Sequence, residues 1–169
     1  MPATLTVKVQ REPFDVSAET AALTRGRTDV GALVTFTGIC RGDENGEPIA
    51  ALNLEHYPGM AEAEIESQVA EAARRWPLTG AIVIHRHGRI IPGEDIMMVA
   101  TASSHRAAAF AAADFLMDYL KTRAPFWKQV EKASGKTGPE KHWVEAKADD
   151  DAAAARWTRP GGPGDQAAE

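Results

Sequence analysis

One long helix is predicted from residue 104 to residue 124, and it constrains the fold because the remaining elements must pack around it. Ser104 suits the N-cap position, where a hydroxyl accepts hydrogen bonds from the unpaired amides of the first turn. Pro125 ends the helix, since the residue before a proline is pushed out of the α region. Cationic side chains gather at both ends: His105, Arg106, Lys121 and Arg123.

The cations at the start of this helix oppose the helix dipole, whose positive end lies there. A bound anion would remove that penalty for His105 and Arg106, because helix N-termini bind phosphate well. A solvated helix start without a ligand is the alternative. Cations at the other end are favourable, and Asp118 lies one turn before Lys121, so Lys121 and Arg123 could be structural.

Short strands and a second helix make up the rest of the predicted fold. Apolar residues at helical spacing predict a helix from Met60 to Trp76, and in the long helix they place Phe110, Ala113, Met117 and Leu120 on the packed face. Alternation and β-forming residues predict strands at 5–9, 31–37, 49–57, 81–84, 96–100, 126–130 and 142–146, and residues 41–48 read as a mobile loop. This order lacks regular βαβ alternation, which favours an α+β fold with a mostly antiparallel sheet.

Composition limits the class of protein. The 169 residues are 44% hydrophobic and 25% charged, as expected for one domain, here residues 1–157, followed by a disordered tail at 158–169. No stretch approaches the roughly 18 apolar residues of a transmembrane helix and no signal peptide is evident, so we expect a cytoplasmic protein. A net charge of -5 argues against a dedicated nucleic-acid binder.

Common catalytic signatures are absent from the sequence. It has no Walker loop, no G-x-G-x-x-G after a strand and no G-x-S-x-G elbow. His85 and His87 alternate like metal ligands but have no third ligand at a convincing spacing, so we favour structural histidines and no metal. The single cysteine, Cys40, excludes an internal disulfide; beside Arg41 it could be a nucleophile, although an inert thiol is the simpler reading.

Five motifs in order carry a resemblance to a known family. They are Thr35-Phe36-Thr37-Gly38 running into Arg41, Leu54–Met60, Ser103–Arg106, Asp118–Lys128 and Trp143–Ala146. Together they resemble the catalytic (large) subunit of molybdopterin synthase over residues 4–157. The resemblance implies an α/β-hammerhead fold with two main helices and a small extra β lobe.

The resemblance also implies a reaction and partners. Sulfur would pass from the C-terminal Gly-Gly thiocarboxylate of a small ubiquitin-like carrier to cyclic pyranopterin monophosphate, making the dithiolene of molybdopterin without a cofactor. A homodimer of the catalytic subunit, with one carrier at each end, would form a heterotetramer. No nucleic acid and no membrane would take part.

The residues that match the family's motifs form the predicted site. Lys121 and Lys128 would be catalytic, and Lys121 could act as an acid, a base or an acyl acceptor. Both reactants are anionic, so cations in the pocket would bind them and stabilise developing charge. Substrate binding is expected at Ile39, Cys40, Arg41, His105, Arg106, Lys121, Lys128, Gln129 and Val130, with Phe36, Met117 and Arg123 lining the pocket.

Helix length separates two parts of this predicted site. His105 and Lys121 are 16 residues apart, which is about 24 Å along a straight helix. They cannot share one small pocket within one chain. We therefore predict a composite site in which His105 and Arg106 come from the other subunit of a two-fold dimer.

The chain departs from the family pattern at Ile39, where relatives commonly carry a lysine. The linker between Lys128 and Trp143 also looks longer, and Lys136 in it could extend the pocket or be solvated. Two non-enzymatic alternatives remain. One is a phosphate-ligand or nucleic-acid module that stacks bases on Phe126, Trp127 and Trp143, and the other is a scaffold that only docks a ubiquitin-like protein.

Overall fold

A four-stranded sheet forms the centre of the fold. The structure is a computed structural model and describes residues 1–133, 142–143 and 148–158. The strand order is β1-β5-β7-β2, with bounds Thr4–Gln10, Leu78–Arg86, Asp95–Ser103 and Ala32–Ile39. β1 pairs with β5 in parallel and the other neighbours are antiparallel, which confirms the mostly antiparallel prediction.

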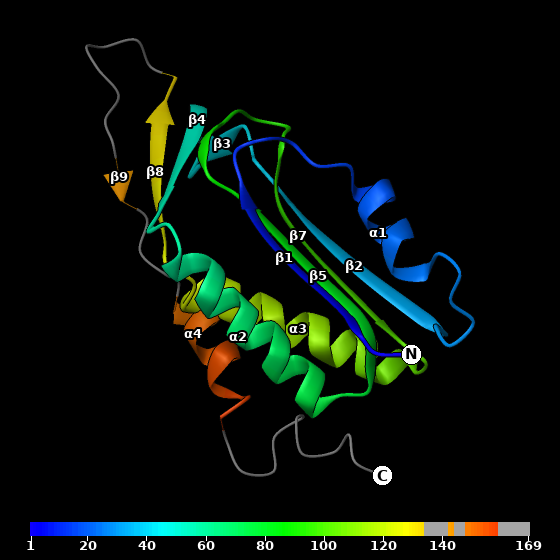
Figure 1. Ribbon diagram of the computed structural model, residues 1–169. Helices are drawn as coiled ribbons and strands as arrows, with labels where there is room; N and C mark the ends of the chain where they lie inside the picture. Colours follow the sequence, from blue (N-terminus) through cyan, green and yellow to red (C-terminus); the bar gives the residue numbers. More distant parts are fainter. Residues whose placement is uncertain (134–141, 144–147, 159–169) are drawn as a thin grey trace.

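Helices cover both faces of this sheet. α2 (Met60–Arg75) and α3 (Arg106–Thr122) lie on one face and α1 (Val16–Thr24) lies on the other (Figure 1). The middle strand β5 shows the consequence, because Ala81 and Val83 join the core beneath α2 and α3 while Ile82 and Ile84 join the core beneath α1. A strand buried on both faces is expected to be apolar at consecutive positions, and residues 81–84 of β5 are.

A second, smaller sheet stands at one end of the first (Figure 1). Its order is β3-β4-β8-β9, with bounds Asp43–Glu44, Glu47–His56, Phe126–Lys132 and His142–Trp143, and β6 (Gly88–Ile90) also pairs with β4. Its core contains Cys40, Ile49, Leu52, Leu54, Ile90 and Val130. The predicted α+β fold of the hammerhead type, with two main helices and a small β lobe, is confirmed; α1 and α4 (Ala148–Ala155) are additional short helices.

The start of the long helix differs from the prediction. Ser104 is not the N-cap: the helix begins at Arg106 and His105, in extended conformation, is the cap residue. The hydroxyl that bonds to the backbone before α3 is that of Ser103, not Ser104. It accepts a hydrogen bond from the His105 amide at 3.1 Å and donates one to the carbonyl oxygen of Pro77 at 2.8 Å. The predicted end is confirmed, since α3 stops at Thr122, before Pro125.

One of the four residues predicted on the packed face of α3 was wrong, while Ala113, Met117 and Leu120 do pack against the core. Phe110 is 59% exposed, so it does not belong to the core. The buried stripe consists mostly of small residues, which let the helix approach the sheet closely: Ala108, Ala109, Ala112, Ala113, Phe115, Leu116 and Tyr119. Met117 and Leu120 lie at the edge of this stripe and are half-buried.

The segment 41–48, predicted to be a mobile loop, is a β-hairpin. β3 pairs with the start of β4 around Asn45 and Gly46, which both have positive φ (55° and 81°). The Asp43 carboxylate accepts from the Gly46 amide at 3.1 Å. Asn-Gly is the preferred pair for a two-residue hairpin turn, so the prediction was wrong because this signal was overlooked.

Some predictions fall on residues outside the described ranges. They concern Lys136 in the linker, residues 144–146 of the last predicted strand, and the tail from residue 159. Within the described ranges, no helix is both long and apolar enough to span a membrane.

Gly31 allows the close approach of β2 to the start of α3. A Cβ atom at this position would collide with the backbone oxygen of Ser104. We expect Gly31→Ala to lower the free energy of unfolding by about 1 to 3 kcal/mol, the usual cost of overpacking. Gly42→Ala is the matched control, because its nearest neighbour would be Pro92 at 4.0 Å. Equal urea midpoints for the two variants would contradict this prediction.

Candidate active site

A cavity of about 440 Å³ lies between the two sheets, beside the C-terminal end of α3. Six of the predicted site residues line it: Phe36, Ile39, Arg41, Met117, Lys121 and Lys128. Strands from both sheets contribute to its wall, so the cavity exists only because the β lobe stands against the central sheet. Three of the six side chains are cationic, although the whole chain has a net charge of -5.

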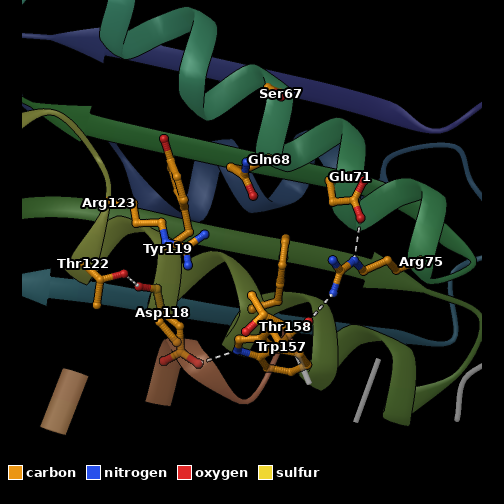
Figure 2. A pocket seen from close by; sticks show the side chains of 12 residues that line it. Ser67, Gln68, Glu71, Arg75, Asp118, Tyr119, Thr122, Arg123, Trp157 and Thr158 are labelled. Carbon is orange, nitrogen blue, oxygen red and sulfur yellow. Dashed lines mark hydrogen bonds and ion pairs between the residues drawn. The ribbon is translucent and has the colours of Figure 1, made fainter. Parts of the chain in front are cut away.

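The other predicted site residues lie elsewhere. Cys40 and Val130 are buried in the core of the small sheet, and Gln129 beside Val130 is 9% exposed. Arg123 lines a second cavity, of about 270 Å³, on the opposite side of α3 (Figure 2). His105 and Arg106 are exposed at the far end of α3.

Three different elements bring the cations together. Lys121 occupies the last turn of α3, and Lys128 follows in β8 after the short connection through Pro125. Lys128 lies opposite Leu54 of β4 in the small sheet. Arg41 follows β2, whose register shifts between Gly38 and Ile39.

The environment of Lys128 in this cavity perturbs its pKa. Burial lowers the pKa of Lys128, and the nearby charges of Arg41 and Lys121 lower it further. Glu44 opposes the shift, with its carboxylate 3.7 Å from Lys128 Nζ. A lysine with a lowered pKa can exchange a proton near neutral pH more readily than an ordinary surface lysine.

Cys40 does not line the large cavity. Its side chain is only 2% exposed, and burial raises the pKa of the thiol. The sulfur lies 3.7 Å from the carbonyl oxygen of Arg41 and 3.8 Å from that of Ile90. A buried thiol with a raised pKa is a poor nucleophile, so this geometry supports the inert reading.

An aromatic stack supports the segment that leads to Lys128. The ring of His85 lies parallel to Phe126 with centroids 3.8 Å apart, and His56 lies on Phe126 with centroids 6.0 Å apart. His85 Nδ1 lies 2.8 Å from the carbonyl oxygen of Arg86 and donates to it in the Nδ1-protonated tautomer. The ring of His85 therefore packs as a neutral aromatic residue against the floor of the cavity.

The burial of His85 predicts a loss of stability in acid. Burial lowers its pKa from 6.5 to about 4, so between these values the unfolded chain binds a proton that the folded chain does not. The corresponding stability is fully present above pH 6.5 and is lost as the pH falls towards 4, by about 3 kcal/mol.

The variant His85→Phe should flatten this dependence, measured by urea unfolding at several pH values. His105→Phe removes an exposed histidine and serves as the control. If the free energy of unfolding fell as steeply with pH in His85→Phe as in the native chain, His85 would not be the source of the acid instability.

Sequence reasoning missed four titratable residues of the cavity wall: Asp43, Glu44, His85 and Asp150. The Asn-Gly turn could have placed Glu44 on a hairpin. No local signal marks Asp150, which comes from α4 and reaches the cavity only through the tertiary fold. Within the described residues, no group of three His, Cys, Asp or Glu side chains could hold a metal ion.

Comparisons with known proteins agree on one family. A family profile described as "MoaE protein" matches residues 9–123. A molybdopterin synthase catalytic subunit from Mesorhizobium japonicum is 62% identical over 152 residues, which cover 90% of this chain and 92% of the relative. One from Rhizobium meliloti is 58% identical over 94% of this chain and 99% of the relative. A solved molybdopterin biosynthesis MoaE protein from Burkholderia ambifaria is 46% identical, with a TM-score of 0.74 over 94% of this chain and 99% of that chain.

Proposed function

Because the chain belongs to the MoaE family of molybdopterin synthase catalytic subunits, and is therefore an enzyme subunit, we propose that it transfers sulfur to a pterin. The donor is the C-terminal thiocarboxylate of a small ubiquitin-like sulfur-carrier subunit. The acceptor is cyclic pyranopterin monophosphate, and the product is the dithiolene of molybdopterin.

The observation that carries this proposal is the meeting of Arg41, Lys121 and Lys128 in one cavity. The thiocarboxylate and the cyclic phosphate are both anions, so a cationic cavity lowers the cost of bringing them together. The volume of about 440 Å³ falls within the range of small-molecule sites.

The geometry supports different roles for the three cations. Lys121 is exposed at the end of α3, where it can reach a carrier tail that enters from solvent. Lys128 is half-buried with a lowered pKa, which suits a group that moves a proton during the transfer. Arg41 is exposed, and its planar guanidinium suits it to binding the phosphate.

His105 and Arg106 complete the site from a second subunit in this proposal. They lie at the opposite end of α3 from Lys121, about 24 Å away for a straight helix. Ile39, whose side chain is 56% exposed at the cavity, lies where relatives commonly carry a lysine. With isoleucine instead of lysine at this position, a larger share of the positive charge in the site comes from the partner subunit.

The nucleic-acid alternative gains little support from the aromatic residues. Phe126 is half-buried and its ring stacks with His85 and His56, which leaves little of it for a base. Of the two rings whose side chains the structure describes, Trp127 is the exposed one, at 46%. Single-strand binders use several such surfaces along a basic groove.

Purified protein, a thiocarboxylated carrier and the pterin precursor test the proposed function. Formation of the dithiolene product that depends on all three components is the expected result. Steeply salt-dependent binding of single-stranded nucleic acid without any pterin turnover would overturn it. Carrier binding without turnover would favour the scaffold alternative.

A further inference from the structure

The C-terminal helix α4 is held against α3 by a specific polar contact. The Asp118 carboxylate accepts from Trp157 Nε1 at 2.5 Å (Figure 2). It also accepts from Arg156 Nη2 at 2.9 Å. Arg156 also forms an ion pair with Asp114 at 2.6 Å, one turn earlier in α3. Two charged side chains on one helix therefore fix the two residues that follow α4.

Apolar packing holds the segment after α4 in the same position. Trp157 is 9% exposed and packs edge-on against Trp76 and Phe115, with ring centroids 5.6 Å and 5.7 Å apart. Arg75 donates to the carbonyl oxygen of Trp157 at 3.3 Å (Figure 2). A tryptophan that is both buried and hydrogen-bonded leaves little freedom to the helix before it.

The position of α4 places one of its carboxylates in the candidate active site. Asp150 lines the large cavity together with Lys121, Thr122 and Ala124. It is half-buried, whereas the neighbouring Asp151 is exposed. The end of α4 thus contacts one side of α3 and its start reaches the cavity on the other.

Asp150 differs from the other carboxylates of this cavity. Among the described residues that line it, Glu44 faces Lys128 at 3.7 Å and Asp43 accepts from the Gly46 amide at 3.1 Å. Asp150 has no hydrogen bond or ion pair with any residue in the described ranges. Polar groups in a binding site are normally hydrogen-bonded, so the free Asp150 carboxylate is available to accept a hydrogen bond from a donor group of the ligand.

We propose that Asp150 binds the N–H edge of the substrate's pterin ring, and that Asp118, Arg156 and Trp157 position it. The amino group and the adjacent ring N–H of a pterin are two parallel donors, like the edge of a guanidinium. A carboxylate accepts such a pair in bidentate geometry. The cations of the cavity hold the phosphate end, so the two ends of the substrate meet opposite charges. This inference rests on the proposed function.

Two simple ligands separate the two ends of the substrate. Binding of 6-hydroxymethylpterin, followed by its fluorescence, reports on the ring, and binding of inorganic phosphate reports on the cations. We expect Asp150→Asn to weaken pterin binding about tenfold or more, because an amide presents a donor to a donor. Phosphate binding should be unchanged or tighter, since a negative charge has been removed.

Asp151→Asn is the matched control, because it removes the same charge from an exposed position of the same helix. Its pterin affinity should equal that of the native chain. If Asp150→Asn binds the pterin as tightly as the native chain, the inference is overturned and the proposed function stands. A native chain that binds neither ligand would overturn both.

The positioning role is tested by Trp157→Phe, which keeps a buried ring and removes the donor to Asp118. It should raise KM for the pterin substrate and leave kcat nearly unchanged. In an Asp150→Asn background the same change should have little further effect, since the contact it positions is already lost. If Trp157→Phe weakened the pterin interaction equally in the native and Asp150→Asn backgrounds, Trp157 would act only on stability.

Discussion

Replacing Lys121 by alanine is expected to slow sulfur transfer by about 100- to 1,000-fold, the usual cost of removing one group that stabilises developing charge. Lys121 is exposed in the cavity, and its backbone is held in the last turn of α3. The rate should be measured at saturating pterin, because the main loss is expected in the chemical step.

Lys8→Ala is the control for this experiment. Lys8 pairs with Glu19 at 2.6 Å, on β1 and α1, and it does not line the cavity. Its rate should match that of the native protein. A Lys121→Ala enzyme that retains half of the native kcat would remove Lys121 from the chemistry and leave only Lys128 as a candidate.

The sequence predicted those elements whose burial is periodic. In α2, Ile65, Val69 and Ala72 recur at helical spacing and are all buried, so its bounds were predicted to within one residue. Strand β5 is buried on both faces, and its residues 81–84 are apolar at consecutive positions. The face of α3 was predicted only in part, because alanine carries a weak hydrophobic signal and the exposed Phe110 was included in the pattern.

The site was predictable where motifs of the family meet the cavity wall, as those with Arg41, Lys121 and Lys128 do. Lys121 and Lys128 belong to one motif, and the turn at Pro125 brings both to the wall. Gln129 and Val130 belong to the same run but do not line the cavity. Strand alternation points Gln129 to the opposite face from Lys128, and Val130 is buried in the core of the small sheet. Asp150 could not be found in this way, because its position depends on contacts between α4 and α3.

Mixed dimers are expected to recover activity from two inactive parents. Lys121→Ala supplies intact His105 and Arg106, and the double variant His105→Ala, Arg106→Ala supplies intact Lys121. If each site takes Lys121 from one subunit and the histidine–arginine pair from its mate, every mixed dimer contains one intact site. Random exchange makes half of the dimers mixed, so the mixture should reach about a quarter of the native rate.

The length of α3 is what makes this outcome informative. The helix runs unbroken from Arg106 to Thr122, so no bend within it brings His105 towards Lys121 of the same chain. Independent sites within single chains would leave every site in the mixture defective, and no activity would return. Recovery must also require subunit exchange, so a mixture of chemically cross-linked parent dimers should stay inactive.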